Sequence, residues 1–131
     1  MIGLDTNVIV RYLVKDDPMQ SALAVKLIRS LSADDRAFVS LVVTAELIGV
    51  LESCYGFNRS ELVDVIESLL ISKELVLEKA ELVSQAAHLL GLGRADFSDY
   101  VIEKSCHAAG CLHTVTFDQK AANAAGMRLL E

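Results

Sequence analysis

Four short strand candidates, three of them apolar runs, are separated by longer segments with helical periodicity and limit the fold of this chain more than any other feature. Runs of this kind, with no alternation of apolar and polar residues, are typical of strands buried on both faces. Helix-patterned segments lie between them, so we expect parallel strands covered by helices on both sides. The prediction is an α/β protein, a three-layer α/β/α sandwich with a short, mostly parallel central sheet. The predicted strands are residues 1–4, 37–43, 75–77 and 113–116.

The helix-patterned segments have recognisable beginnings and ends. Asp17 can cap a helix that starts at Pro18, because proline suits the first helical position. Ser60 is a second expected cap, and Gly110 is expected to end a helix. Residues 127–130 form a candidate edge strand. The predicted helices are 6–14, 18–31, 44–54, 61–70, 80–90, 97–109 and 118–125.

Length and composition set the remaining bounds. The 131 residues suit a single domain, 1–131, and the 53% hydrophobic content can form a core without disulfides. The three cysteines are an odd, scattered set, so we expect buried or half-buried free thiols. No apolar run reaches the roughly 18 residues of a membrane helix, and the N-terminus lacks a signal-peptide pattern. The expected location is the cytoplasm, with no membrane partner.

Acidic residues follow the predicted strands. Asp5 follows the first strand, Glu46 opens the helix after the second, and Asp118 comes shortly after residue 116. Ligands of open parallel sheets bind beyond the carboxyl ends of the strands, so these side chains are expected at one edge. Asp96 and Asp99 lie three residues apart at a helix start and share one helix face.

Each of these acids taken alone is explained by helix capping, but the joint pattern is not. Carboxylates gathered at one sheet edge repel one another, and a shared divalent cation is the simplest compensation. Oxygen ligands without His or Cys favour Mg²⁺ or Mn²⁺ over zinc. A loaded site of this kind attracts phosphate, so the net charge of −6 does not exclude a nucleic-acid substrate.

The chemistry expected of such a site is hydrolysis by metal-activated water. A bound dication lowers the pKa of water and neutralises a phosphodiester transition state. Ser98 has no His at motif spacing, so a covalent mechanism is disfavoured. Arg11 and Arg94 lie close in sequence to the acidic segments and are the candidate RNA phosphate contacts. Lys15 and Lys120 are expected to be solvated surface residues.

Four segments, in order, resemble the acidic motifs of the PIN-domain family. Any one of these segments is weak evidence for the family, whereas four of them in order within one short chain are specific evidence. In length and motif style the chain is most similar to VapC-type toxins, the endoribonucleases of type II toxin–antitoxin pairs. The four segments are Asp5-Thr6-Asn7-Val8, Thr44-Ala45-Glu46-Leu47, Asp96-Phe97-Ser98-Asp99 and Thr116-Phe117-Asp118.

This resemblance implies a Mg²⁺- or Mn²⁺-dependent endoribonuclease that forms a homodimer and is neutralised by a cognate antitoxin. It implies that the catalytic and metal-holding residues are Asp5, Glu46, Asp99 and Asp118. The supporting residues that it implies are Asn7, Thr116 and Asp96.

Two alternatives compete with this interpretation. A non-catalytic PIN-like module would bind RNA or protein without cutting it. Such a module would be expected to have lost some of the acidic metal ligands, whereas this chain has the complete set, which argues against this alternative. A phosphatase or a response-regulator receiver is the other alternative. The phosphatase needs a second Asp where Asn7 stands, and the receiver needs an acidic pair ahead of Asp5, where residues 1–4 are apolar.

Overall fold

The computed structural model describes all residues from 1 to 131 and confirms the predicted α/β class. Helices dominate, and every strand is only two or three residues long. In chain order the elements are β1 (Ile2–Gly3), α1 (Thr6–Leu13), α2 (Pro18–Ser30), β2 (Ala37–Val39), α3 (Leu41–Tyr55), α4 (Arg59–Ile71), β3 (Leu75–Leu77), α5 (Ala80–Leu92), α6 (Phe97–Ala108), β4 (Val115–Thr116), α7 (Gln119–Ala124) and β5 (Arg128–Leu129).

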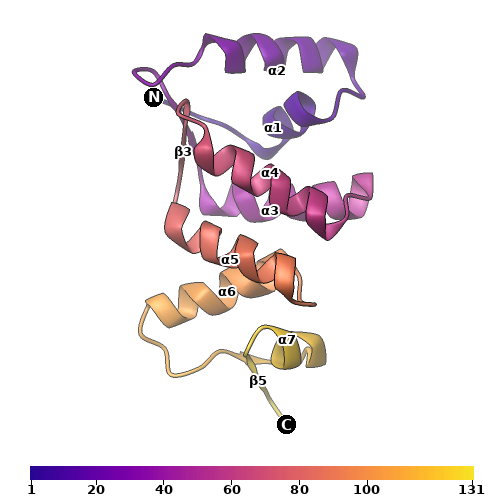
Figure 1. The fold of residues 1–131 in the computed structure, drawn as a ribbon, viewed down its shortest axis with the longest axis vertical. Coiled ribbons are helices and arrows are strands. Elements are labelled where there is room, and N and C mark those ends of the chain that lie inside the picture. Colours follow the sequence, from indigo (N-terminus) through magenta and orange to yellow (C-terminus); the bar gives the residue numbers. More distant parts are fainter.

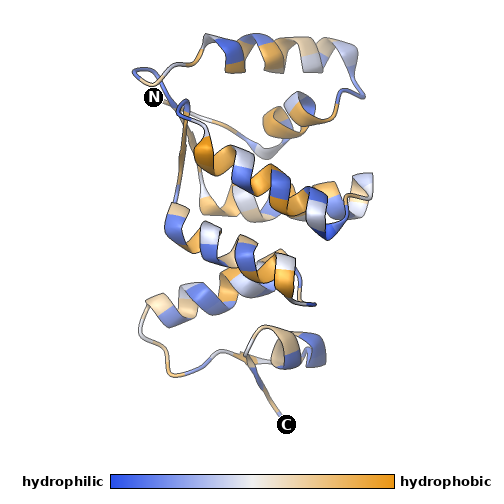
Figure 2. Cartoon of the chain, in the orientation of Figure 1, coloured by the Kyte–Doolittle hydropathy of each residue, from blue (hydrophilic) through white to orange (hydrophobic).

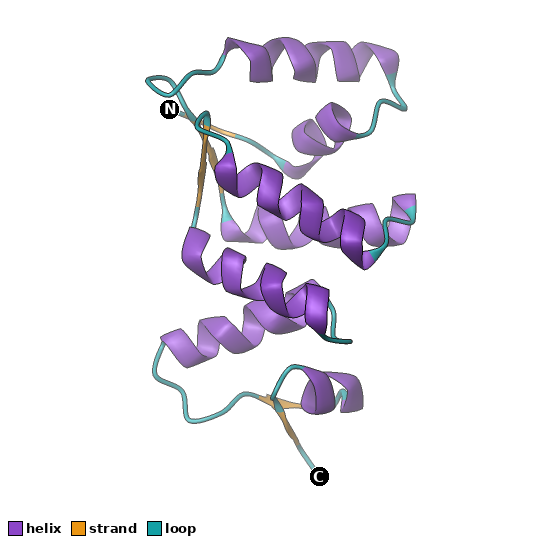
Figure 3. Ribbon diagram, in the orientation of Figure 1, coloured by secondary structure: helices purple, strands orange, loops and turns teal.

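The strands form two separate parallel sheets (Figure 3). In the first sheet β2 lies between β1 and β3, with Ala37 opposite both Ile2 and Leu75. In the second sheet β4 pairs with β5, with Val115 opposite Arg128. The parallel pairing agrees with the sequence-based prediction, whereas the division into two sheets was not predicted.

Side-chain caps fix where several helices begin. Asp17 accepts a hydrogen bond from the Gln20 N–H at 3.1 Å, which confirms the predicted start of α2. Ser40 accepts from the Val43 N–H at 3.2 Å, so α3 begins at Leu41 and the predicted strand 37–43 is wrong beyond Val39.

The start of α4 also differs from the prediction. Asn58, not Ser60, caps this helix, and its side chain and that of Glu61 each accept the other residue's N–H. This reciprocal capping box satisfies two backbone donors that a helix start otherwise leaves unpaired, which explains why the helix begins at Arg59.

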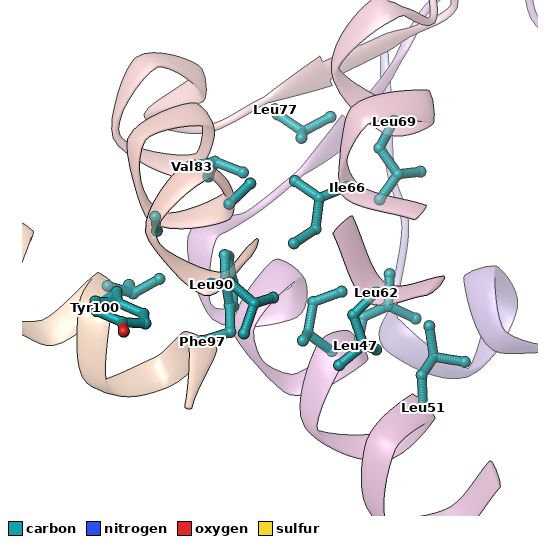
Figure 4. Packing of buried hydrophobic residues seen from close by; sticks show 14 of the residues in the cluster. Leu47, Leu51, Leu62, Ile66, Leu69, Leu77, Val83, Leu90, Phe97 and Tyr100 are labelled. Atoms are coloured by element: carbon teal, nitrogen blue, oxygen red, sulfur yellow. The ribbon is translucent and has the colours of Figure 1, made fainter. Parts of the chain in front are cut away.

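The core lies between α3, α4, α5 and α6 (Figures 2 and 4). In Figure 2 hydrophobic residues recur along α4 and the visible part of α3. Leu47 and Leu51 of α3 and Leu62 and Ile66 of α4 have no exposed surface, and Leu90 of α5 has 1%. Burial on this scale is the main stabilising term for a chain of this size. It fixes α3, the helix that carries Glu46.

The turn between α5 and α6 positions the acids at the start of α6. The Tyr100 hydroxyl accepts a hydrogen bond from the Ala95 N–H and occupies the space where a Cβ on Gly93 would lie. The Arg59 guanidinium donates to the carbonyls of Leu90, at 3.0 Å, and Ala95, at 2.7 Å. Residue 93 is therefore restricted to glycine, and the backbone that leads into α6 is held from two sides.

The elements are stacked along one long axis (Figure 1). The N-terminus lies near one end with α1 and α2, and α7, β5 and the C-terminus lie at the other. Elements α7, β4 and β5 pack mainly on one another. No helix has both the length and the apolar composition needed to cross a bilayer. Cys54 and Cys111 are exposed and Cys106 is half-buried, so the prediction of buried or half-buried thiols is wrong for the first two.

Candidate functional site

Asp5 and Glu46 line one pocket of about 240 Å³ between α1 and α3. Asp5 is the N-cap of α1, and its Oδ1 accepts a hydrogen bond from the Thr6 N–H at 2.8 Å. Glu46 reaches the same pocket from the second turn of α3, and both residues are exposed to solvent. The predicted proximity of these two acids is therefore present in the structure. The lining residues are Asp5, Thr6, Asn7, Val10, Arg11, Glu46, Val50 and Tyr55.

Thr6, which also lines this pocket, has an unsatisfied hydroxyl. The residue is 5% exposed, and its Oγ1 has no hydrogen-bond partner in the protein. A buried hydroxyl without a partner costs about 1–3 kcal/mol, so such groups in native proteins usually meet a ligand or water. The position next to Asp5 was not singled out by sequence reasoning, which used only the flanking Asp and Asn.

Arg11 is held rigidly at the mouth of the pocket. Its Nε donates to Gln20 Oε1 at 2.7 Å, and its Nη1 donates to Asp16 Oδ1 at 3.2 Å and to the Tyr55 hydroxyl at 3.1 Å. Tyr55 in turn donates to Asp16 Oδ2 at 2.9 Å. The Tyr55 hydrogen bond, followed by the charge of Asp16, raises the pKa of Arg11 above its ordinary value. These contacts fix a permanent positive charge beside two carboxylates.

A second acidic group lies at the start of α6 and α7. Asp96 pairs with Lys120 at 3.2 Å, and this contact, together with the nearby charges of Asp99 and Asp118, raises the pKa of Lys120. Asp118 caps α7 by accepting from the Lys120 N–H at 2.9 Å. The carboxylate of Asp99 accepts from the Asp96 N–H at 3.1 Å. Lys120 is thus a local counter-charge for these acids rather than only a solvated side chain.

The two acidic groups do not merge. No group of three or more His, Cys, Asp or Glu side chains is arranged to hold a metal ion. The predicted convergence of all four carboxylates on one cation is therefore absent from this arrangement. The physical reason is the division of the sheet: Asp5 follows β1, Asp118 follows β4, and these strands belong to different sheets.

The remaining predicted residues are divided in the same way. Asn7 lines the pocket with Asp5, and the Thr116 hydroxyl accepts from the Asp118 N–H at 3.0 Å, so it supports that acid. Arg94 is exposed, and Asp96 pairs with Lys120 instead of with Arg94. Of the two arginines proposed as RNA contacts, only Arg11 lies beside an acidic pocket.

The sequence pattern of the PIN domain family matches residues 2–127, nearly the whole chain. The chain belongs to the PIN domain family. PIN domains are typically metal-dependent nucleases, so this membership points to a nuclease in general terms. No curated protein matches the chain.

The donor chemistry of this PIN domain suits a hard dication, since Asp5 and Glu46 offer carboxylate oxygens in one pocket, whose lining also includes Thr6 with its unpaired hydroxyl. The donors in this pocket are too few to hold a dication, because Asp99 and Asp118 belong to the other acidic group. The pocket therefore has the type of ligand that a divalent metal prefers, but only two of the four predicted carboxylates.

Proposed function

We propose that this single PIN domain is a Mg²⁺- or Mn²⁺-dependent endoribonuclease that hydrolyses RNA phosphodiester bonds. The observation that supports it best is the pocket lined by two carboxylates and a fixed guanidinium, with Thr6, whose buried hydroxyl is unpaired, also in its lining. Phosphodiester hydrolysis needs both parts of this arrangement: acids that hold a cation, and a positive group that receives a phosphate.

The proposed roles follow the position of each group. Asp5 and Glu46 hold the metal, which when bound supplies an activated water and charge neutralisation. Asn7 orients these carboxylates through its amide. Arg11 receives a phosphate of the RNA, because its Nη2 has no protein partner while Nε and Nη1 are engaged.

Asp99 and Asp118 complete the proposed catalytic set when the two acidic groups are brought together. Thr116 and Asp96 support them in this proposal, and Arg94 is a second RNA contact on the outer surface. The finer biological proposal is a VapC-type toxin in the cytoplasm, active as a homodimer and neutralised by a small antitoxin. A short reading frame for a DNA-binding protein next to the gene would support this role.

A direct assay separates the enzyme from the non-catalytic alternative. The purified chain is incubated with an end-labelled RNA of mixed sequence, with excess EDTA in one arm and with about millimolar Mn²⁺ in the other. Cleavage confined to the Mn²⁺ arm supports the proposal. RNA binding without cleavage in either arm would instead establish the binding module.

Replacing Thr6 by valine tests whether the unpaired hydroxyl serves the ligand. Valine keeps the shape and removes the unsatisfied group, so the stability to urea should be unchanged or higher. The affinity for Mn²⁺, measured by electron paramagnetic resonance without RNA, should fall about three- to tenfold, as expected for one lost polar contact. Ser21→Ala is the matched control, because Ser21 has the other unpaired buried hydroxyl and lies outside this pocket. Equal affinities in all three proteins would remove Thr6 from the site.

Arg11→Lys tests the guanidinium at the pocket mouth. Lysine keeps the charge but not the planar set of donors that binds Gln20, Tyr55 and phosphate together. We expect KM for RNA to rise about tenfold with kcat little changed, which corresponds to about 1.4 kcal/mol of binding. The control is Arg29→Lys on the exposed face of α2. A loss confined to kcat would contradict a role in substrate binding.

A further inference from the structure

A second hollow, of about 260 Å³, lies between α1 and α2, which pack on each other at one end of the molecule (Figure 1). Asn7 and Arg11 line both this hollow and the acidic pocket, so the two spaces adjoin at these residues. The other wall comes from α2, where residues three and four positions apart share one helix face. Its members are Gln20, Leu23, Ala24 and Leu27.

The lining of this hollow is mainly aliphatic. Leu23 is 66% exposed, Val8 and Leu27 are half-buried, and Ala24 is buried. An apolar hollow that adjoins a fixed guanidinium suits a ligand with an apolar part next to an anionic part. A nucleobase beside its phosphate is such a ligand, and bases that leave the stack are held against apolar side chains.

The side-chain amide of Gln20 is oriented by Arg11. Its Oε1 accepts a hydrogen bond from the Arg11 Nε at 2.7 Å, and its Nε2 makes no hydrogen bond within the protein. An amide nitrogen donates hydrogen bonds and accepts none. With its acceptor engaged by Arg11, Gln20 therefore offers donors to a ligand in the hollow.

Nucleobases differ in how they meet a donor of this kind. Uracil presents the acceptor O4 and guanine presents O6, whereas cytosine and adenine have an amino group at the equivalent position. An amide N–H that faces an amino group leaves both donors without a partner, which costs free energy once water is excluded. The free donors of Gln20 therefore favour the keto bases.

We infer that the hollow between α1 and α2 holds one base of an RNA strand and that Gln20 selects uracil or guanine over cytosine or adenine there. This rests on the proposed function, in which Arg11 receives a phosphate of the same strand. Leu23 and Leu27 pack against the base, and Gln20 determines its identity. The charge of Arg11 at the junction favours a phosphate-bearing strand over a neutral protein segment as the occupant.

The first test compares two RNAs whose bases have the same size but opposite edges. The affinities of a labelled oligouridylate and an oligocytidylate of equal length are measured by fluorescence anisotropy, with EDTA present so that no cleavage occurs. The oligouridylate should bind about three- to tenfold more tightly, as expected for one hydrogen bond made or lost. Equal affinities, or no binding of either RNA, would overturn the inference.

Gln20→Glu should reverse this preference. Glutamate keeps an oxygen that accepts from the Arg11 Nε and replaces the donors by an acceptor. Carboxylates accept from the cytosine amino group, so the oligocytidylate should become the tighter ligand. Gln85→Glu is the matched control, because it adds the same charge at an exposed position of α5 and should keep the preference for uridylate. A ratio of affinities that Gln20→Glu leaves unchanged would refute a role of Gln20 in base selection.

Leu23→Ala tests the apolar contact without altering the amide. Both RNAs should bind about three- to tenfold more weakly with their ratio preserved, because the base loses contact area. Met19→Ala is the control, since Met19 is 79% exposed on the same helix but does not line the hollow, and its affinities should equal those of the wild type. If the two variants bind RNA alike, no base packs on Leu23 and the hollow belongs to another occupant, such as a protein segment.

The base site and the proposed nuclease fail in different ways. A preference for uridylate in EDTA without any cleavage in Mn²⁺ would contradict the nuclease and leave the base site standing. Cleavage in Mn²⁺ with equal affinities for the two RNAs would do the reverse.

Discussion

RNA cleavage by the Asp5→Asn variant is expected to fall at least about 100-fold, with little change in stability. Loss even of groups that only support a metal ligand costs 10- to 100-fold, so removing a ligand charge should cost more. The fold should survive because Asp5 also caps α1, and asparagine caps a helix about as well as aspartate. Initial cleavage rates with Mn²⁺ and thermal unfolding curves measure the two effects.

Asp17→Asn is the matched control for this variant. Asp17 is also a helix N-cap, although it accepts from the Gln20 N–H three residues on whereas Asp5 accepts from the adjacent Thr6 N–H, and it lies outside the acidic pocket. The control should therefore cleave RNA at the wild-type rate. If Asp5→Asn cleaved RNA as fast as Asp17→Asn, the pocket between α1 and α3 would not be the catalytic site.

Leu47→Ala is expected to destabilise the protein by about 2–5 kcal/mol. Leu47 has no exposed surface, and its side chain packs in the cluster shown in Figure 4, so alanine leaves a cavity there. Because Leu47 follows Glu46 directly, the loss also loosens the helix that carries this acid. Urea unfolding followed by circular dichroism gives the free energy of unfolding.

Val42→Ala on the same helix is the control for the core variant. Val42 is 75% exposed, and the free energy of unfolding should change by less than about 0.5 kcal/mol. A loss below about 1 kcal/mol for Leu47→Ala would show that α3 is not anchored as the structure indicates.

The parts of the fold that depend on residues adjacent in sequence were predictable. The Asp17–Pro18 start of α2 and the strand at Leu75–Leu77 follow from capping and apolar patterning alone. The boundary at Ser40 was missed because Val42 and Val43 favour strands locally, while the Ser40 cap and the buried Thr44 and Leu47 favour a helix. Here tertiary burial overrode local propensity.

The site was predictable one segment at a time. Asp5 and Glu46 were expected together and share a pocket, whereas the joining of both with Asp118 depends on which strands pair, which no local pattern encodes. Tyr55 was not among the predicted site residues, and its hydroxyl holds Arg11 across a separation of 44 residues. A signal for Thr6 existed in its position between Asp5 and Asn7, but its burial could not be read from sequence.

The ammonium group of Lys120 has a consequence for metal affinity. It already neutralises part of the charge of Asp96, with Asp99 and Asp118 close by. A dication that binds these acids has to displace this resident monovalent charge, so loading is an exchange rather than a simple addition. Salt screens an exposed pair of this kind, so ionic strength changes both sides of that exchange.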